Sequence, residues 1–506
     1  MFFFYQSMKV SKYLKTRFTT LFLSKQELKN SINLINPFPI LKQLNWLQWQ
    51  YFMIGFLAWS FDAFDYFAVS INVSRLALEF NKSITDITWA MTLVLMLRSI
   101  GSILIGYFAD RYGRKWSLIG NLLILTILQI GIGFVQNFKQ FLAIRAIFGI
   151  VMGGMFGVAS ATSLESSPKI SRSILSGIFQ QGYAFGYLLV IAFQRAFDQT
   201  SKTWRALFWF SSLPPSLIII WRLLLPENEA FIEQKLHFKT QNASFGKDFI
   251  KIFKKYWLKM LYMIILMTGI SFMSHGSQDL YPTLLTKQLN FSNDESTITN
   301  TIANLGAIIG GILFGHFSGL LGRRFAITIC CIFGGCLIYP WAFSFKNVGI
   351  NVSVFFLQFF VQGALGIIPI HLSELSPPEF KVFVSGTAYQ LGNLAASASS
   401  TIESKIGEKY PLNSRLHEEG VYNYAKVMSI FMGCVFGFIL IVIILGPENR
   451  NGEINFKLTN DELLELQEEG ILRTINHEEE INVVIINNDK ILNHDDKYKL
   501  EHCENS

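Results

Sequence analysis

Charged residues are scarce in this chain. They make up 16% of its 506 residues, whereas a soluble domain carries about 25%. Hydrophobic residues reach 51% and aromatic residues 15%. This balance excludes an ordinary soluble domain and predicts a chain that lies in a membrane. The formal net charge of +7 does not indicate nucleic-acid binding, because the basic residues cluster beside the ends of hydrophobic segments.

Cysteine is also rare, and the five cysteines form no CxxC pair and have no histidine partner. Four of them lie inside hydrophobic segments (Cys330, Cys331, Cys336 and Cys434), and Cys503 lies near the C-terminus. We therefore expect small apolar fillers, with no disulfide and no metal site. The sequence shows no nucleophile–base set either, so an enzyme is the least favoured class and no cofactor is expected.

The N-terminal segment is basic and has no acidic residue before Glu27. It lacks an uninterrupted apolar core and a small-residue cleavage site, which argues against a secretory signal peptide. A mitochondrial presequence shares this charge bias and is the lesser alternative. We predict a cytosolic tail over residues 1–46.

Apolar windows of about 20 residues recur along the chain, each long enough to cross a hydrocarbon core of about 30 Å. They lie near residues 49–72, 88–109, 116–135, 139–161, 173–195, 205–225, 258–282, 297–319, 325–345, 350–371, 383–402 and 425–446. Lipid offers no hydrogen-bond partners, so these spans must be helices. The sequence therefore predicts an all-α integral membrane protein with twelve transmembrane helices.

The chain contains an internal duplication. The segment GYFADRYGRK starts at Gly106, and the related GHFSGLLGRR starts at Gly315, 209 residues later. The same offset relates Glu165 to Glu374, Pro168 to Pro377, Ser176-Gly177 to Ser385-Gly386 and Gln181 to Gln390. A constant register over three helices predicts two pseudo-symmetric six-helix bundles, over 47–226 and 258–446.

The placement of lysine and arginine predicts the orientation of the chain. The loops DRYGRK and GRR, the N-terminal tail and the central loop 227–257 are basic and fall on one side, which we expect to be cytosolic together with both termini. The C-terminal tail, 447–506, is acidic and has no apolar periodicity long enough for a domain. We predict a mostly disordered cytosolic tail that binds trafficking or ubiquitination machinery.

Polar residues enter the end of the seventh span, where Ser271, His275, Gln278 and Asp279 share one helical face. An unneutralised charge at mid-bilayer costs roughly 2.5–3.5 kcal/mol on insertion scales. His275 and Asp279 must therefore be neutral or paired, which is what a proton carrier needs. The alternative is a structural hydrogen bond that fixes two helices.

Further charges lie in the first, second and fourth spans. Asp62 and Asp65, one turn apart, are either proton-coupling residues or salt-bridge partners of a nearby basic residue. Arg98 lies near mid-membrane, where its permanent charge and planar fork suit a carboxylate. We favour an anionic substrate as its partner, and the alternative partner is Asp62 or Asp65. Arg145 either packs beside glycines or relays protons.

Amide side chains occupy related places in the fifth and eleventh spans, namely Gln181, Gln390 and Asn393. They either orient a ligand or join helices. The loop GYFADRYGRK is different, because its polar residues lie at the expected cytosolic boundary. For this loop we predict a gating role, carried by Gly106, Asp110, Arg111, Gly113, Arg114 and Lys115.

These segments carry a resemblance to a known family. GYFADRYGRK resembles the loop signature GxxxDRxGR[RK] of the major facilitator superfamily, and Arg145 with Gly149 and Gly153 resembles its fourth-helix motif. FMSHGSQDLYPT and YQLGNLAASASSTIE are similar to the fungal carboxylate–proton permeases, the lactate/pyruvate group of the sialate–proton symporter family. The resemblance covers all twelve spans and neither tail.

The resemblance implies roles for individual residues. It ties the seventh helix to substrate binding and proton coupling, and it places Arg98, Gln390 and Asn393 on the substrate path. The signature of that helix is Nxx[ST]Hx[ST]QDxxxT, and Ser271 stands where the pattern has asparagine. This departure leaves open whether monocarboxylates or dicarboxylates are preferred.

The sequence thus predicts a plasma-membrane importer that carries short-chain carboxylates, such as lactate or pyruvate, together with a proton. Such acids are anions at neutral pH, and two bundles would rock about a central cavity. The expected partners are the carboxylate anion, the proton and the lipid bilayer. Predicted substrate-binding residues are Arg98, His275, Gln278, Gln390 and Asn393, and predicted proton-coupling residues are His275, Asp279, Asp62 and Asp65.

Two alternatives stay open. One is transport of another solute, such as sialate, phosphate or a sugar, although LPENEAF stands where sugar porters carry PESPR. The other is a nutrient receptor with the same fold that signals without moving substrate.

Overall fold

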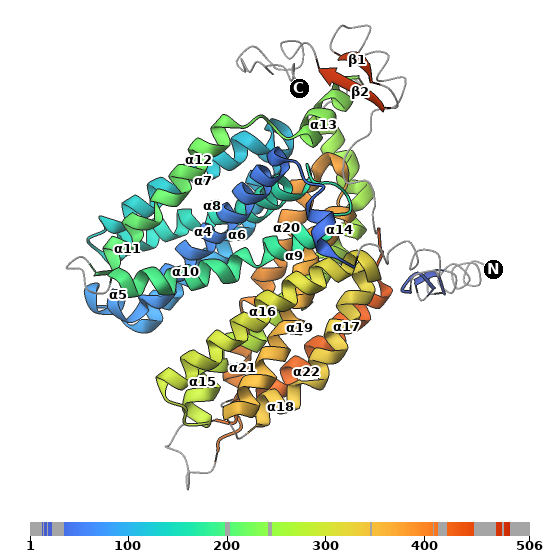
Figure 1. The fold of residues 1–506 in the computed structure, drawn as a ribbon. Coiled ribbons are helices and arrows are strands. Elements are labelled where there is room, and N and C mark those ends of the chain that lie inside the picture. Colours follow the sequence, from blue (N-terminus) through green and yellow to red (C-terminus); the bar gives the residue numbers. More distant parts are fainter. Residues whose placement is uncertain are drawn as a thin grey trace.

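The computed structural model describes residues 13, 15–17, 19–22, 35–197, 203–240, 245–344, 347–407, 409–412, 422–449, 472–477 and 480–485. Within this part, the chain is almost entirely helical and forms two bundles (Figure 1). The first bundle and the segment before it comprise α3 (Pro37–Leu41), α4 (Trp46–Ile71), α5 (Val73–Glu79), α6 (Ile84–Tyr112), α7 (Arg114–Gly133), α8 (Phe138–Leu164), α9 (Arg172–Gln180), α10 (Gly182–Phe197), α11 (Thr203–Ser211) and α12 (Leu213–Leu224).

A central helix, α13 (Glu229–Thr240), connects the two bundles. The second bundle comprises α14 (Phe245–Gln278), α15 (Tyr281–Thr283), the π-helical turn η2 (Leu284–Gln288), α16 (Asn293–Leu321), α17 (Arg323–Cys336), α18 (Ile338–Phe343), α19 (Asn347–Leu375), the 3₁₀ turn η3 (Pro378–Phe380), α20 (Lys381–Ala396), α21 (Ser399–Gly407) and α22 (Tyr424–Leu445). The prediction of an all-α membrane protein is confirmed.

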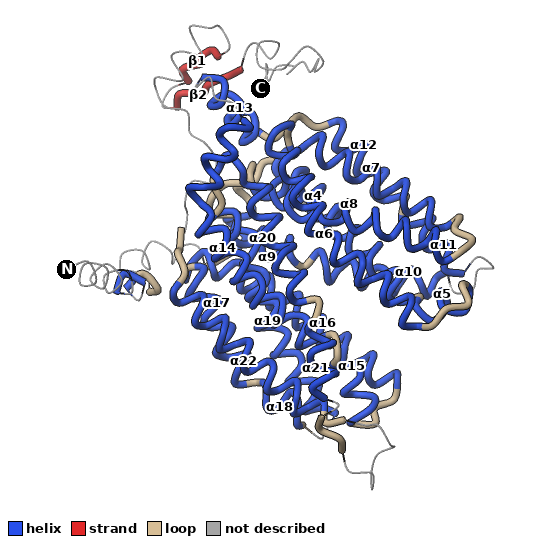
Figure 2. The backbone as a smooth tube through the Cα atoms, turned by 180° about the vertical axis from the view of Figure 1, so that it is seen from behind, coloured by secondary structure: helices blue, strands red, loops and turns tan. Residues whose placement is uncertain are grey.

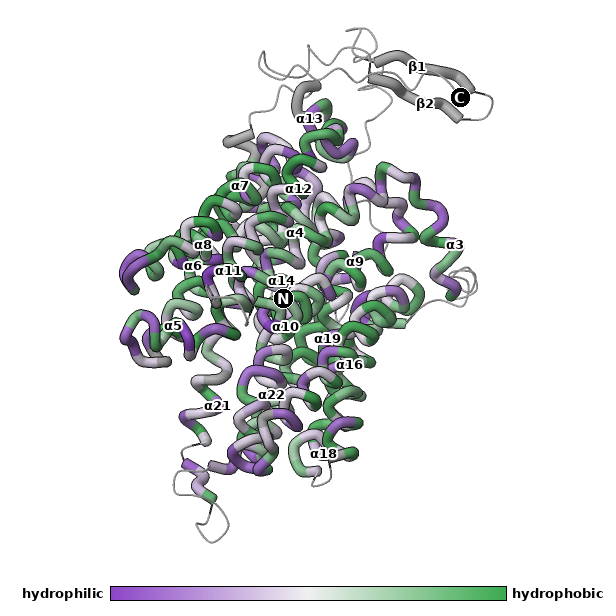
Figure 3. The backbone as a smooth tube through the Cα atoms, turned by 60° about the vertical axis from the view of Figure 1, so that its left-hand side comes forward, coloured by the Kyte–Doolittle hydropathy of each residue, from purple (hydrophilic) through white to green (hydrophobic). Residues whose placement is uncertain are grey.

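Eleven segments in the described part of the chain are long and apolar enough to cross a membrane. The predicted span 383–402 is not among them, because it is divided between α20 and α21. The break follows Ala396, where Ser397 caps α20, and α21 starts at Ser399. Hydrophobic residues dominate the long helices, while hydrophilic residues gather near helix ends (Figure 3).

The duplication is visible in the local geometry of the helix ends. Ser83 and Ser292, 209 residues apart, each begin a long helix with a capping box that satisfies otherwise free backbone N–H groups. The same two helices end at Gly113 (φ 107°) and Gly322 (φ 95°). Glycine adopts these positive φ angles without a Cβ clash, so each glycine allows a tight turn into the next helix.

The two bundles meet at one end of the molecule and diverge towards the other (Figures 1 and 2). We call the end with the turns at Gly113 and Gly322 the closed end, and the end with α5, α15 and α18 the open end. Contacts between the halves join α6 and α8 to α20, and α9 to α16 and α19.

Segments outside the bundles differ from the sequence prediction in part. The central loop predicted over 227–257 contains α13 and the first turns of α14. The helix α13 is held at the closed end, where the Phe231 ring lies 5.3 Å from the guanidinium carbon of Arg114. The disorder predicted for the C-terminal tail falls mostly outside the described residues. Within them, β1 (Leu472–His477) pairs with β2 (Glu480–Ile485) in an antiparallel hairpin.

Four of the five cysteines belong to the described part of the chain, and all four are free thiols. Cys330 and Cys331 are buried, as expected of small apolar fillers, whereas Cys336 and Cys434 are exposed.

Candidate functional site

The polar face predicted at the end of the seventh span is present on α14. Nδ1 of His275 lies 3.1 Å from a carboxylate oxygen of Asp279, one helical turn further along. The two side chains are 28% and 38% exposed, so both are partly accessible. His275 interacts electrostatically with Arg98, and Asp279 with Tyr66. The pair therefore faces the first bundle.

Amide and hydroxyl groups tie this face of α14 to its neighbours. Gln278 donates to Gln358 of α19 across 2.8 Å, and Gln358 donates to Ser277 across 3.0 Å. Ser271 donates to Oδ1 of Asn393 in α20 across 3.1 Å. Gln278 and Asn393 thus form interhelical bonds in this structure, and their ligand-orienting role stays a prediction.

Arg98 lies on α6 with its side chain almost completely buried. A Cβ at Gly153 of α8 would overlap the Arg98 carbonyl, so the glycine permits close packing of the two helices. Asp62 of α4 interacts electrostatically with Arg98. Within the described part of the chain, Nε of Arg98 and both carboxylate oxygens of Asp62 have no hydrogen-bond partner.

The second acidic residue of α4 points to a different basic residue. Asp65 is fully buried and interacts electrostatically with Arg145 of α8, beside Ser211 and Gln129. The Arg145 guanidinium lies 4.1 Å from the centre of the Phe148 ring. Asp62 interacts electrostatically with both Arg98 and Arg145, whereas Asp65 interacts with Arg145. This arrangement suits the packing interpretation of Arg145, and a relay role stays a prediction.

The predicted amides contact the opposite bundle. Gln390 of α20 donates to the Gly153 carbonyl across 3.3 Å. A Cβ at Gly311 of α16 would overlap the Gln181 side chain, so this glutamine packs directly on α16. Both contacts join helices, and both contribute to the closure of the halves in this state.

The loop predicted to act as a gate does join the two halves at the closed end. The Asp110 carboxylate accepts hydrogen bonds from the backbone N–H groups of Val382 and Phe383, at 3.2 and 2.8 Å. These groups belong to the first turn of α20, so Asp110 caps a helix of the other bundle. Gly106 lies one turn earlier, and a Cβ there would approach the Phe383 backbone to 2.8 Å.

A buried cluster of ion pairs lies next to the Asp110 cap. Arg114 binds Glu165 through two bonds of 3.0 Å, and Lys381 of the second bundle lies 3.2 Å from the same carboxylate. Burial opposes ionisation of Glu165, but Arg114 and Lys381 outweigh it and lower the pKa of the carboxyl below its usual value. Glu165 is therefore ionised and links the two halves.

The other basic residues of the loop have different environments. The Lys115 ammonium donates to the carbonyls of Leu223 and Leu225, at 2.9 and 2.6 Å, and so binds the C-terminal end of α12. Arg111 is exposed, with its guanidinium 5.2 Å from the Tyr112 ring. Of these three basic residues, Arg114 takes part in the ion cluster between the two bundles. Lys115 and Arg111 lie beside that cluster.

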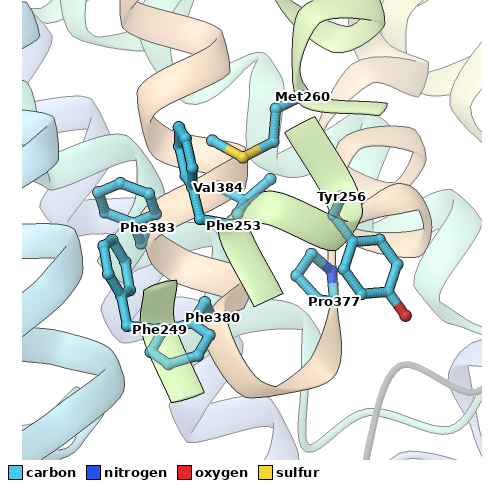
Figure 4. A pocket seen from close by; sticks show the side chains of 8 residues that line it. All are labelled: Phe249, Phe253, Tyr256, Met260, Pro377, Phe380, Phe383 and Val384. Atoms are coloured by element: carbon cyan, nitrogen blue, oxygen red, sulfur yellow. The ribbon is translucent and has the colours of Figure 1, made fainter. Parts of the chain in front are cut away.

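A small apolar hollow also lies at the closed end, between α14 and the η3–α20 segment (Figure 4). Its lining residues are Phe249, Phe253, Tyr256, Met260, Pro377, Phe380, Phe383 and Val384. None of these side chains carries a charge at neutral pH. The hollow is therefore a packing feature, and its lining offers no charged group for an anion.

Several residues of the interface were not singled out from the sequence. Gln180 donates to the Tyr389 hydroxyl of the other bundle across 3.1 Å. The repeat could have identified Lys381, because Arg172 stands 209 positions earlier. Glu403, just after the predicted eleventh span, is fully buried. Its sequence position alone indicated only a loop boundary.

Comparison with known proteins places this arrangement in a family. Residues 37–454 match the family described as sugar (and other) transporters. A carboxylic acid transporter protein homolog of Saccharomyces cerevisiae is 38% identical over 469 residues, which cover 88% of this chain and 75% of that protein. The cis,cis-muconate transport protein of Acinetobacter baylyi is 26% identical over 69% of this chain and 86% of its own length. The sialic acid transporter NanX of Escherichia coli is 26% identical over 74% and 91%.

Solved structures show the same fold. The proton:xylose symporter XylE aligns with a TM-score of 0.63 at 17% identity, over 80% of this chain and 97% of XylE. The human organic anion transporter MFSD10 aligns with a TM-score of 0.59 at 13% identity, over 79% and 99%. With the family match over most of the sequence, these findings establish that the chain belongs to the sugar (and other) transporter family of the major facilitator superfamily and is a multi-pass membrane transporter.

Proposed function

We propose that this transporter imports short-chain carboxylates, such as lactate or pyruvate, across the plasma membrane together with a proton. The observation that carries the proposal is that a cation of the first bundle lies close to a titratable pair of the second bundle. Arg98, on the first bundle, is a buried permanent cation, and it interacts with His275 of the partly exposed His275–Asp279 pair on the second bundle. An anion and a proton can thus bind at one interface.

The names of the relatives support a carboxylate. The 38% identical yeast protein is named as a carboxylic acid transporter homolog, and more distant relatives carry the names of muconate, sialic acid and niacin. All of these solutes bear a carboxyl group. A guanidinium provides two parallel N–H donors for such a group. We propose that Arg98 supplies them, and that Gln390 and Asn393 orient the bound acid.

The proposed orientation follows from the basic loops. The turns at Gly113 and Gly322 are flanked by arginine and lysine, which favour the cytosolic side. If the closed end is cytosolic, the divergent end faces outwards and the structure represents an outward-facing state. Both termini would then be cytosolic.

A transport cycle follows from the charges. In the outward-facing state, Asp62 neutralises Arg98 electrostatically and Asp279 is paired with His275. The incoming carboxylate takes the place of Asp62 at Arg98, Asp62 keeps its interaction with Arg145, and a proton neutralises Asp279. Closing the open end over an ionised Asp279 would leave a buried charge, which costs about 2.5–3.5 kcal/mol on insertion scales. Loading both substrate and proton therefore favours closure, and this condition couples the two fluxes.

The test is uptake by proteoliposomes with an imposed pH gradient and a panel of labelled mono- and dicarboxylates. We expect lactate or pyruvate to accumulate only when the outside is acidic, and we expect no accumulation of a neutral sugar. Gradient-independent equilibration of the acids would remove proton coupling from the proposal. Accumulation of xylose instead would show that the substrate is a sugar and that the proposed carboxylate specificity is wrong.

A further inference from the structure

Glu403 is a buried carboxyl close to the proposed proton site. It lies on α21, which packs against α14 and α22 near the open end. Its side chain is fully buried, and neither carboxylate oxygen has a hydrogen-bond partner within the described residues. A buried carboxylate without a partner is strongly unfavourable, whereas the protonated acid is neutral. The site therefore favours a bound proton.

The titratable neighbours of Glu403 are few. Asp279, at the end of α14, interacts electrostatically with Glu403 and is itself bonded to His275. On α21, Lys405 is exposed. The single charged residue of α22 is Lys426, whose ammonium lies 4.5 Å from the centre of the Tyr410 ring. Asp279 is thus the group with which Glu403 can exchange a proton.

The first bundle provides a comparison at the same place in the repeat. Gln194 lies 209 residues before Glu403 and is also buried. Its Oε1 accepts a hydrogen bond of 2.7 Å from Asn72, so this amide is held by a partner. At this position of the repeat, the first bundle therefore has a buried amide that is hydrogen-bonded. The second bundle has an ionisable group without such a bond.

We propose that Glu403 is a second proton-binding residue, which holds the transported proton in the present state and passes it to Asp279 as the open end closes. The proton leaves an Oε atom of Glu403 and binds an Oδ atom of Asp279, so total charge is unchanged. Because the two carboxyls interact, their titration belongs to the pair. The inference rests on the proposed proton coupling and adds a site to it.

A direct test uses infrared spectroscopy of the purified protein in detergent or lipid. We expect the carbonyl band of buried, protonated carboxyls to be the same in the unmodified protein and in Asp279→Asn, and to lose the component of Glu403 in Glu403→Gln. Persistence of the whole band in Glu403→Gln would overturn the assignment. This result does not depend on transport, so it stands or falls separately from the proposed function.

A functional test measures uptake against external pH in proteoliposomes. In Glu403→Gln, the external pH of half-maximal uptake should fall by about one unit, a tenfold loss of proton affinity, while carboxylate exchange without a gradient is retained. Glu403→Asp should restore part of the shift. The matched control is Gln194→Asn, which alters a buried amide and should leave the pH dependence unchanged. An unaltered pH profile in Glu403→Gln would contradict the proposal.

Discussion

The two bundles share one design at the closed end and differ near the middle of the molecule. Arg114 binds Glu165 in the first half, and Arg323 binds Glu374 in the second half through bonds of 2.9 and 3.1 Å. Each arginine and each glutamate has its counterpart 209 residues away. The frame that holds the helices together at this end is therefore duplicated.

A second pair of glutamates also repeats, with a longer offset of 221 residues from Glu227 to Glu448. Glu227 accepts from the backbone N–H of Lys115, and Glu448 accepts from that of Arg323, so each caps the helix after the glycine turn. Burial raises the pKa of both carboxyls, against the opposing effect of nearby arginines. The duplicated end thus keeps its capping groups as well as its ion pairs.

The charges near the middle are not duplicated. The first bundle contains the basic residues Arg98 and Arg145, whose counterparts in the repeat are Ala307 and Val354. The second bundle contains His275, whose counterpart is Tyr66. A symmetric frame supports a rocking motion of equal bodies. The asymmetric charges divide the proposed anion and proton sites between those bodies, so both are complete only when the bundles face each other.

The largest effect is expected from removing the cation of the first bundle. Arg98→Ala should abolish carboxylate uptake while the protein is still present in the membrane, because the anion loses its partner. Arg98→Lys should retain little activity, since an ammonium lacks the planar fork. Uptake and surface protein are measured in the same cells. Normal uptake by Arg98→Ala would make this arginine a structural partner of Asp62.

Removing the charge of the second bundle should separate accumulation from exchange. Asp279→Asn is locked in a neutral state, so it should still exchange carboxylate but should not accumulate it against a gradient. Counterflow and pH-driven uptake are measured in the same vesicles. Full pH-driven accumulation would move the proton site to Asp62 or Asp65. His275→Ala should flatten or shift the pH dependence of uptake.

The duplicated clamp can be broken in either half. Glu165→Gln removes a partner from Arg114 and from Lys381 of the other bundle, and loss of one partner of a buried pair costs about 3–5 kcal/mol. Glu374→Gln removes the ion-pair partner of Arg323, which keeps its bond of 2.8 Å to Ser173, and removes an electrostatic neighbour of Arg172. We expect the two halves to separate at the closed end in a larger fraction of molecules in Glu165→Gln than in Glu374→Gln. Distances between spin labels on the two halves measure this fraction. Equal opening in both variants would show that Lys381 contributes nothing.

The same clamp has a defined pH dependence. The pKa of Glu165 is lowered from 4.5, so its contribution to stability is fully present above that value and is lost as the pH falls through the lowered pKa. Acidification to about pH 5 should therefore leave the spin-label distances at the closed end unchanged. Opening at that pH would require a different sensor.

A smaller difference between the halves lies in one hydroxyl group. Ser176 of the first bundle enters the backbone of α19 next to Pro369, where Ile370 N–H donates to its oxygen (3.1 Å) and its hydroxyl donates to Gly366 (2.9 Å). In a regular helix, the N–H of Ile370 would bond to the Gly366 carbonyl directly. The counterpart of Ser176 in the second bundle is Ser385, whose hydroxyl donates to the Lys381 carbonyl of its own helix.

Ser176→Ala should weaken the closed end by about 1 kcal/mol, the usual net value of one hydrogen bond. Ser385→Ala removes only a bond within α20 and serves as the matched control. Spin-label distances at the closed end give the two populations. An equal shift in both variants would mean that the inserted hydroxyl does not hold the halves together.

Much of the fold was predictable, because its determinants are local. The run of apolar residues requires a helix in lipid, and each predicted span coincides with helical structure in the described residues, although the eleventh is broken after Ala396. The face shared by His275 and Asp279 follows from helical spacing alone. Glu403 was not predictable in the same way, because its burial depends on how α21 packs against α14.

The membrane-spanning segments, the duplication and the family follow from the chain alone, because hydrophobic length, repeat offset and motif residues are properties of the sequence. Which charges meet depends on how the helices pack. Asp62 and Asp65 are one turn apart on α4, yet Asp62 interacts with both Arg98 and Arg145, while Asp65 interacts with Arg145. That choice depends on how α4, α6 and α8 are rotated and how closely they approach, which their small residues and side-chain packing fix in three dimensions.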